Sequence, residues 1–107
     1  MSVHVKLSGS LRYPNVPAAT AALRALRRKA TDNWVIGSFK RVDATLSIEL
    51  DSFVSFEDRI EEVLTRIEEA AATATGGAIN FVEDDTRRAR IAAPRRRARA
   101  GGKQRSQ

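Results

Sequence analysis

Two stretches of the chain alternate strictly between apolar and polar residues, and this period of two is the strongest limit on the fold. In residues 3–13 (VHVKLSGSLRY) one face carries Val3, Val5, Leu7, Leu11 and Tyr13. Residues 44–51 repeat the pattern with Ala44, Leu46, Ile48 and Leu50. Such alternation is typical of a strand buried on one face and solvated on the other. Gly9 falls on the apolar side, where it predicts a bulge or the close approach of a helix.

Two further stretches have helical spacing. Asn15 is a suitable cap for a helix with Pro17 in its first turn. The apolar stripe of this helix consists of Val16, Ala19, Leu23, Leu26 and Ala30. A second helix begins near Ser55, which forms an approximate capping box with Asp58, and it ends at Gly76-Gly77. Its stripe consists of Ile60, Val63, Leu64, Ile67 and Ala71.

The remaining segments supply two more strands, WVIGSFKRV (residues 34–42) and AINFVE (residues 78–83). The turn before residue 44 is either Gly37-Ser38 or Lys40 to Asp43, and the second choice gives strands of more even length. The element order is then β-α-β-β-α-β. Two right-handed crossovers predict an α+β fold, a split β-α-β sandwich with both helices on one face of a four-stranded antiparallel sheet. This order resembles the ferredoxin-like architecture, which hosts many unrelated functions and therefore implies none.

The net charge of +6 is divided very unevenly along the chain. Residues 1–85 carry 10 basic and 13 acidic side chains, whereas residues 86–107 carry 9 basic side chains and no acidic one. The sequence therefore predicts a mildly acidic domain over residues 1–85 and an arginine-rich tail over residues 86–107. Ile91 is the only sizeable apolar residue of the tail, so we expect the tail to be disordered when free.

The tail gives the leading functional hypothesis, which is a small protein that binds DNA or RNA without sequence preference. Arginine side chains bind phosphate through two parallel hydrogen bonds, and nothing in the tail reads bases. The predicted phosphate contacts are Arg87, Arg88, Arg90, Arg95, Arg96, Arg97, Arg99, Lys103 and Arg105. The alternative is a protein-interaction or assembly module that forms a homodimer through the open sheet face or a sheet edge. In that case the basic tail is incidental.

An enzyme is not expected. His4 is the only histidine and has no serine or cysteine nucleophile at a recognisable spacing, and the chain contains no cysteine. The acidic run Glu83-Asp84-Asp85, even with Asp51, offers too few oxygen ligands for a divalent cation. No phosphate-binding glycine motif is present. We therefore expect no metal, no cofactor and no small-molecule substrate.

Binding of RNA on the sheet in the manner of RNA-recognition motifs is not expected either, because that mode stacks bases on aromatic residues of the central strands. The outward positions of the two alternating stretches are polar: His4, Lys6, Ser8, Ser10, Arg12, Thr45, Ser47 and Glu49. No apolar run approaches the roughly 20 residues of a membrane span, and the first residues lack the order of a signal peptide. The chain is therefore expected to be cytoplasmic, with no membrane partner.

Overall fold

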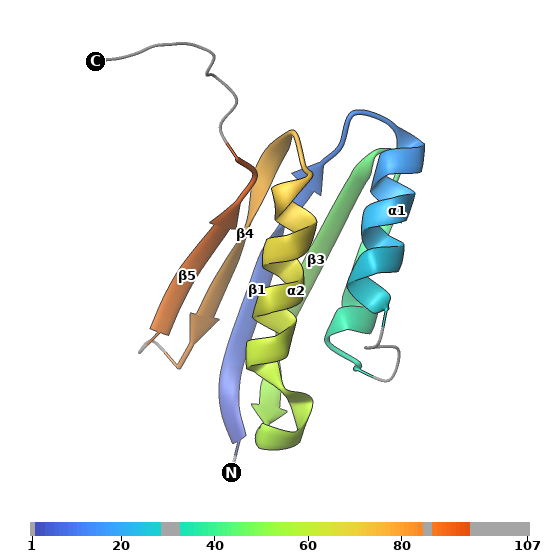
Figure 1. Cartoon of the computed structure of the whole chain (residues 1–107). Coiled ribbons are helices and arrows are strands. Elements are labelled where there is room, and N and C mark those ends of the chain that lie inside the picture. Colours follow the sequence, from blue (N-terminus) through green and yellow to red (C-terminus); the bar gives the residue numbers. More distant parts are fainter. Residues whose placement is uncertain (1, 29–32, 85–86, 95–107) are drawn as a thin grey trace, which may run out of the picture.

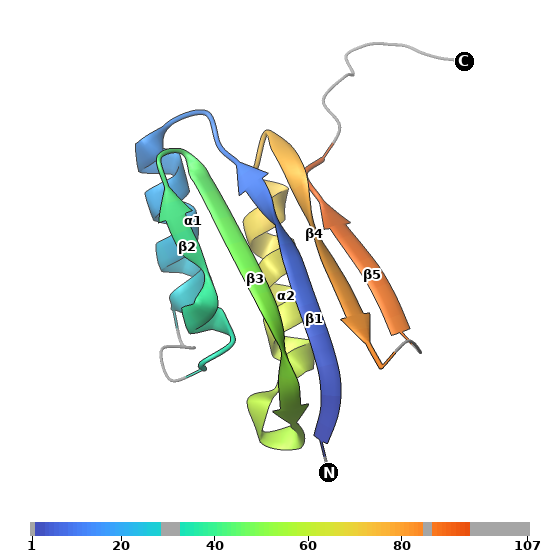
Figure 2. The ribbon, with the colours of Figure 1, turned by 180° about the vertical axis from the view of Figure 1, so that it is seen from behind.

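Two helices lie on one face of a five-stranded antiparallel sheet (Figure 1). The structure is a computed structural model, and it describes residues 2–28, 33–84 and 87–94. The elements in chain order are β1 (Ser2–Arg12), α1 (Val16–Arg27), β2 (Lys40–Val42), β3 (Thr45–Ser55), α2 (Ile60–Ala72), β4 (Gly76–Glu83) and β5 (Arg87–Ala92). The order of the strands across the sheet is β2-β3-β1-β4-β5. Within the described residues no helix covers the other face, which Figure 2 shows from behind.

The core lies between the helices and the covered face of the sheet, as the alternation predicts. The inward residues of β1 are paired with inward residues of both neighbours, so that Leu7 lies between Leu50 of β3 and Phe81 of β4. The predicted stripe of α2 is confirmed, since Val63, Leu64, Ile67 and Ala71 are buried. The predicted stripe of α1 is only partly correct. Ala19 and Leu26 are buried, but Val16 at the first helical position is 43 % exposed.

The prediction of a four-stranded sheet is wrong, because the start of the basic tail forms a fifth strand. β5 pairs with β4 in antiparallel register, and Ala93 N–H continues the ladder by donating to Gly77 O at 3.0 Å. Ala89 and Ile91 of β5 are partly buried against the core. They lie beside Phe81 and Ile79 of β4. Residues 87–92 therefore belong to the folded unit, and residues 95–107 of the predicted tail lie outside the described residues.

The predicted turn between β2 and β3 is also misplaced. The two strands are joined at Asp43 and Ala44, where Asp43 has φ 54°, a left-handed conformation that Asp tolerates better than most residues. Lys40 to Val42, predicted as the turn, form β2 itself. The apolar residues before β2 form a turn and the 3-10 helix Ile36–Ser38 instead of a strand. Asn33 holds this turn, because its Oδ1 accepts hydrogen bonds from Val35 N–H at 3.0 Å and from Ile36 N–H at 3.2 Å.

Gly9 marks a close approach between two strands and not the predicted bulge or approach of a helix, since the register of β1 continues unbroken through it. Its φ is +134°, and a Cβ at this position would collide with the carbonyl oxygen of Ala78 in β4. Gly77 mirrors it, with φ +95° and the Ser10 carbonyl in the same relation. Only glycine adopts such backbone conformations without strain. The central pair of strands, β1 and β4, therefore depends on these two residues for its close contact.

Two truncations test whether β5 is part of the fold. A chain ending at Pro94 keeps β5 and should unfold in urea within about 0.5 kcal/mol of the full chain. A chain ending at Thr86 loses β5 and the burial of Ile91, so its free energy of unfolding should fall by about 2 kcal/mol or more. Equal stability of the two truncated chains would show that β5 contributes nothing to the folded unit.

Candidate functional site

The open face of the sheet is built from the residues that alternate with the core positions. Residues paired across neighbouring strands point to the same face, so the register assigns each side chain. From β1 and β3 the face carries His4, Lys6, Ser8, Ser10, Arg12, Thr45, Ser47, Glu49, Asp51 and Phe53. The outer strands add Lys40 and Val42 of β2, Ala78, Asn80 and Val82 of β4, and Arg88, Arg90 and Ala92 of β5. Polar and basic side chains therefore dominate this face.

Three of the predicted phosphate contacts lie in β5, on two different faces of the sheet. Arg88 and Arg90 lie on the open face, opposite Val82 and Asn80 of β4. Arg87 lies on the helix side, where its guanidinium binds the carboxylate of Glu61 in α2 through two hydrogen bonds. The other six, Arg95, Arg96, Arg97, Arg99, Lys103 and Arg105, lie outside the described residues. Arg87 thus lies on the opposite face of the sheet from Arg88 and Arg90, although the sequence predicts one continuous basic segment.

The pairing of Arg87 is local and electrostatic. Its hydrogen bonds lower the pKa of the Glu61 carboxyl group and raise the pKa of the Arg87 guanidinium. Glu83 lies 3.7 Å from the same guanidinium, and the centroid of the Phe81 ring lies 5.5 Å from it. Arg87 therefore ties β5 to α2, and a phosphate group would have to compete with these partners for it.

Positive charge exceeds negative charge on the open face of the described residues. Its cations are Lys6, Arg12, Lys40, Arg88 and Arg90, and its carboxylates are Glu49 and Asp51. Asp51 accepts a hydrogen bond from the His4 ring and lies 3.9 Å from the ammonium group of Lys6, so its charge is partly compensated. The guanidinium of Arg12 lies over Gly76, where a Cβ would collide with it. This side chain therefore reaches across the open face toward β4.

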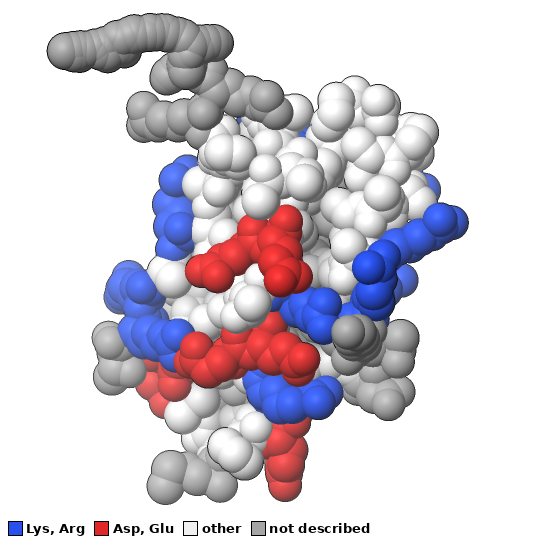
Figure 3. All heavy atoms as spheres, in the orientation of Figure 1, with Lys and Arg blue, Asp and Glu red and all other residues white. Residues whose placement is uncertain are grey.

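The helix face carries both signs of charge. Acidic side chains gather over α2 in its centre, with basic side chains between them and toward the margins (Figure 3). Arg59 and Arg66 both lie within 4.0 Å of Glu62. Glu61, Glu68 and Glu69 of α2 are all exposed. Because a polyanion is attracted to the basic sheet face and repelled by the acidic patch over α2, these two surfaces differ in the partner that they favour.

Phe53 is an open-face residue that the sequence pattern of residues 44–51 does not include. It lies in β3 directly opposite His4, the residue is 67 % exposed, and the centroids of the two rings are 5.2 Å apart. β3 continues beyond Asp51 to Ser55. Extending the period of two by one step places Phe53 on the open face. The expectation that the central strands carry no outward aromatic residue is therefore wrong at this position.

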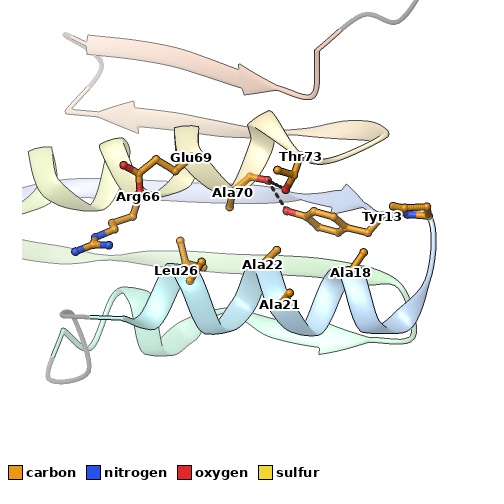
Figure 4. Close-up of a pocket in the computed structure, with 11 residues that line it drawn as sticks. Tyr13, Ala18, Ala21, Ala22, Leu26, Arg66, Glu69, Ala70 and Thr73 are labelled. Atoms are coloured by element: carbon orange, nitrogen blue, oxygen red, sulfur yellow. Dashed lines mark hydrogen bonds between the residues drawn. The ribbon is translucent and has the colours of Figure 1, made fainter.

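A groove lies between the two helices (Figure 4). Its volume is about 330 Å³, and its walls include Tyr13, Ala18, Ala22, Leu26 and Ala70. The hydroxyl group of Tyr13 points into it and donates a hydrogen bond to Ala70 O at 2.6 Å. Burial raises the pKa of Tyr13 to about 12. Arg66, Glu69 and Thr73 also line the groove, and the hydroxyl group of Tyr13 is engaged in holding this residue to α2.

Comparison with known proteins names no other site. No protein-family model matches the chain, and no curated protein or solved structure is significantly similar to it.

Among the described residues, no three histidine, aspartate or glutamate side chains are arranged to hold a metal ion. Asp84 of the predicted acidic run accepts a hydrogen bond from His4 N–H at 3.0 Å, and Asp85 lies outside the described residues. No helix in the described part of the chain is long and apolar enough to cross a membrane.

The raised pKa of Tyr13 predicts a stability change at high pH. Because the folded-state pKa of about 12 exceeds the ordinary value of 10.0, the neutral hydroxyl stabilises the fold fully below pH 10. This contribution is lost as the pH rises from 10 to 12. Tyr13→Phe should cost about 1 kcal/mol at neutral pH, since it removes the hydrogen bond to Ala70. The wild type's advantage should shrink and then reverse in urea titrations carried from neutral pH to about pH 12, because the raised pKa outweighs the lost hydrogen bond. Parallel pH profiles would contradict the assignment.

Proposed function

We propose that the protein binds nucleic acid through phosphate contacts of its arginine-rich C-terminal segment and of the open sheet face. The observation that carries the proposal is the position of β5. This strand places Arg88 and Arg90 on the basic face, at the start of the acid-free segment 86–107. Six further cations of that segment follow β5 in the chain. Cations of the folded unit and of the C-terminal segment can therefore engage one polyanion together.

The chemistry of these residues suits phosphate and not base edges. A guanidinium group donates two parallel hydrogen bonds to phosphate oxygens and stays charged at all physiological pH values. Binding of this kind releases condensed counterions, which makes affinity strongly dependent on salt. Contacts to phosphates position a protein on nucleic acid but carry no direct sequence information. We therefore expect similar affinity for different sequences.

We propose further that the fold is a ferredoxin-like sandwich extended by one strand. The order β2-β3-β1-β4 and the placement of both helices on one face support this interpretation. β5 is then an addition at the edge of β4. Under this interpretation the extra strand connects the basic C-terminal segment to the open face of the sheet.

A second candidate function is a protein-interaction module, and exposed aromatic residues favour it. Phe53 is 67 % exposed and Phe56, which directly follows β3, is 94 % exposed. Exposed apolar side chains that cluster often mark a contact surface. The two functions differ in their dependence on the C-terminal segment. A chain ending at Pro94 should lose most nucleic-acid affinity under the first function and keep its protein partner under the second.

Salt dependence tests the proposed function directly. Fluorescence anisotropy with a labelled duplex should show log affinity falling linearly with log salt, with a slope of roughly −4 to −7. Changing Arg95, Arg96 and Arg97 together to Ala should flatten the slope by about 2 to 3 and weaken all sequences alike. The triple change to Lys should keep most of the slope but lose affinity, because the charge remains and the two-pronged contact is gone.

A matched pair of single variants tests the role of the open face. Arg90→Ala removes a cation from this face and should flatten the salt slope by about 1. Arg87→Ala removes a cation that binds Glu61 on the helix side, so its slope should stay closer to that of the wild type. Equal effects of the two variants would show that the face of the sheet is irrelevant. If the intact protein binds neither DNA nor RNA in a salt-dependent way near physiological ionic strength, the proposed function is wrong.

A further inference from the structure

We infer that the open face takes a single-stranded nucleic acid, one base of which stacks on Phe53 while its phosphates lie over the cations of β1 and β5. This inference rests on the proposed function and deepens it, because it names the form of nucleic acid and the residue that selects it. Single-strand-binding proteins combine a basic surface along the backbone with aromatic side chains on which bases stack. Both parts are present on the open face.

Phe53 has the geometry of a stacking platform. It lies in β3 next to Val54, which is buried on the opposite face, so the ring of Phe53 is not part of the core. The His4 ring lies beside it at a centroid distance of 5.2 Å and an interplanar angle of 49°. A hydrogen bond from the His4 ring to Asp51 fixes His4 in turn. Phe53 is thus supported on one side by a held ring and open to solvent on the other.

The cations lie where the phosphates of a bound strand would pass. Lys6 lies in β1, the neighbour of β3, and Arg88 and Arg90 lie in β5 at the far edge. Neighbouring strands are about 4.8 Å apart, so β3 and β5 are separated by about 14 Å. The polar side chains of Ser8 and Asn80 lie between them on the same face. A few nucleotides crossing the sheet from Phe53 would therefore meet hydrogen-bonding groups and then arginine forks.

A duplex does not fit this arrangement. Its bases are already stacked on one another, and their faces are not accessible to Phe53 except at the ends of the helix. The rigid duplex can meet the cations of the C-terminal segment, but only an unpaired strand uses the aromatic ring. The open face therefore favours single strands over duplexes.

Charge argues against a second copy of the chain as the occupant. Two open faces packed together would oppose five cations and two carboxylates to an identical set. Like charges brought together at an interface are repelled, and the shared excess is positive. A polyanion instead complements this surface. The charge of the face thus selects nucleic acid over self-association.

The test compares Phe53→Ala with Phe56→Ala in the full chain. The probes are an oligothymidine and an oligouridine of about 15 nucleotides and a duplex of the same length, enough to cross one binding surface, measured by anisotropy at fixed salt. Phe53→Ala should weaken binding of both single strands by roughly 5- to 100-fold, the range for loss of one stacked base. Its duplex affinity and its salt slope should be unchanged, because no charge is removed. Phe56→Ala, which removes a still more exposed ring outside the sheet, should change neither affinity.

The outcomes separate this inference from the proposed function. If Phe53→Ala binds single strands as tightly as the wild type does, the inference is wrong while the proposed function stands. If the wild type binds none of the three probes, the proposed function fails. Phe53→Leu keeps an apolar side chain without the ring, so it covers the case in which the alanine variant does not fold. A dimer that disappears in Phe53→Ala, without a change in single-strand binding, would assign the face to a second copy.

Discussion

The structure depends on the two-faced character of β1. This strand is paired with β3 along its whole length and with β4 from Val5 to Arg12. Its inward residues Val5, Leu7 and Leu11 are fully buried under the helices, and they create the layer on which α1 and α2 pack. Its outward residues are necessarily left on the opposite face. One alternating strand therefore sets both the core and the surface that we propose as the binding site.

β5 changes the meaning of the basic segment. As a free tail, its nine cations would act as a flexible polyelectrolyte beside an acidic domain. The β4–β5 ladder divides them, because alternation sends Arg88 and Arg90 to the open face and Arg87 to Glu61 on the helix side. The result is a molecule with a basic sheet face and, on the helix side, an acidic patch over α2, which Figure 3 shows. An asymmetry of this kind orients a charged partner before any contact is made.

The candidate site could be predicted in part from the alternation. His4, Lys6 and Arg12 are assigned to the open face by the period of two, and they lie there. Phe53 follows the same period and could have been assigned to the open face, since β3 continues beyond Asp51. The position of β2 could not be predicted from this period. The segment before it contains adjacent apolar residues, Val35 and Ile36, that are both buried in a turn and so follow no period.

The elements β1, β3 and α2, and the buried face of each, can be read from the order of the residues. These follow from side-chain spacing, which is a local property of the chain. Residues 87–92, in contrast, form a strand only through their pairing with β4. Their apolar content is too small to predict a strand. They form one because the edge of β4 has N–H and C=O groups that need partners. In addition, Ile91 and Ala89 lie beside Ile79 and Phe81 of β4 and pack against the core. Residues 87–92 become a strand because of β4, and the sequence of 87–92 alone does not show this.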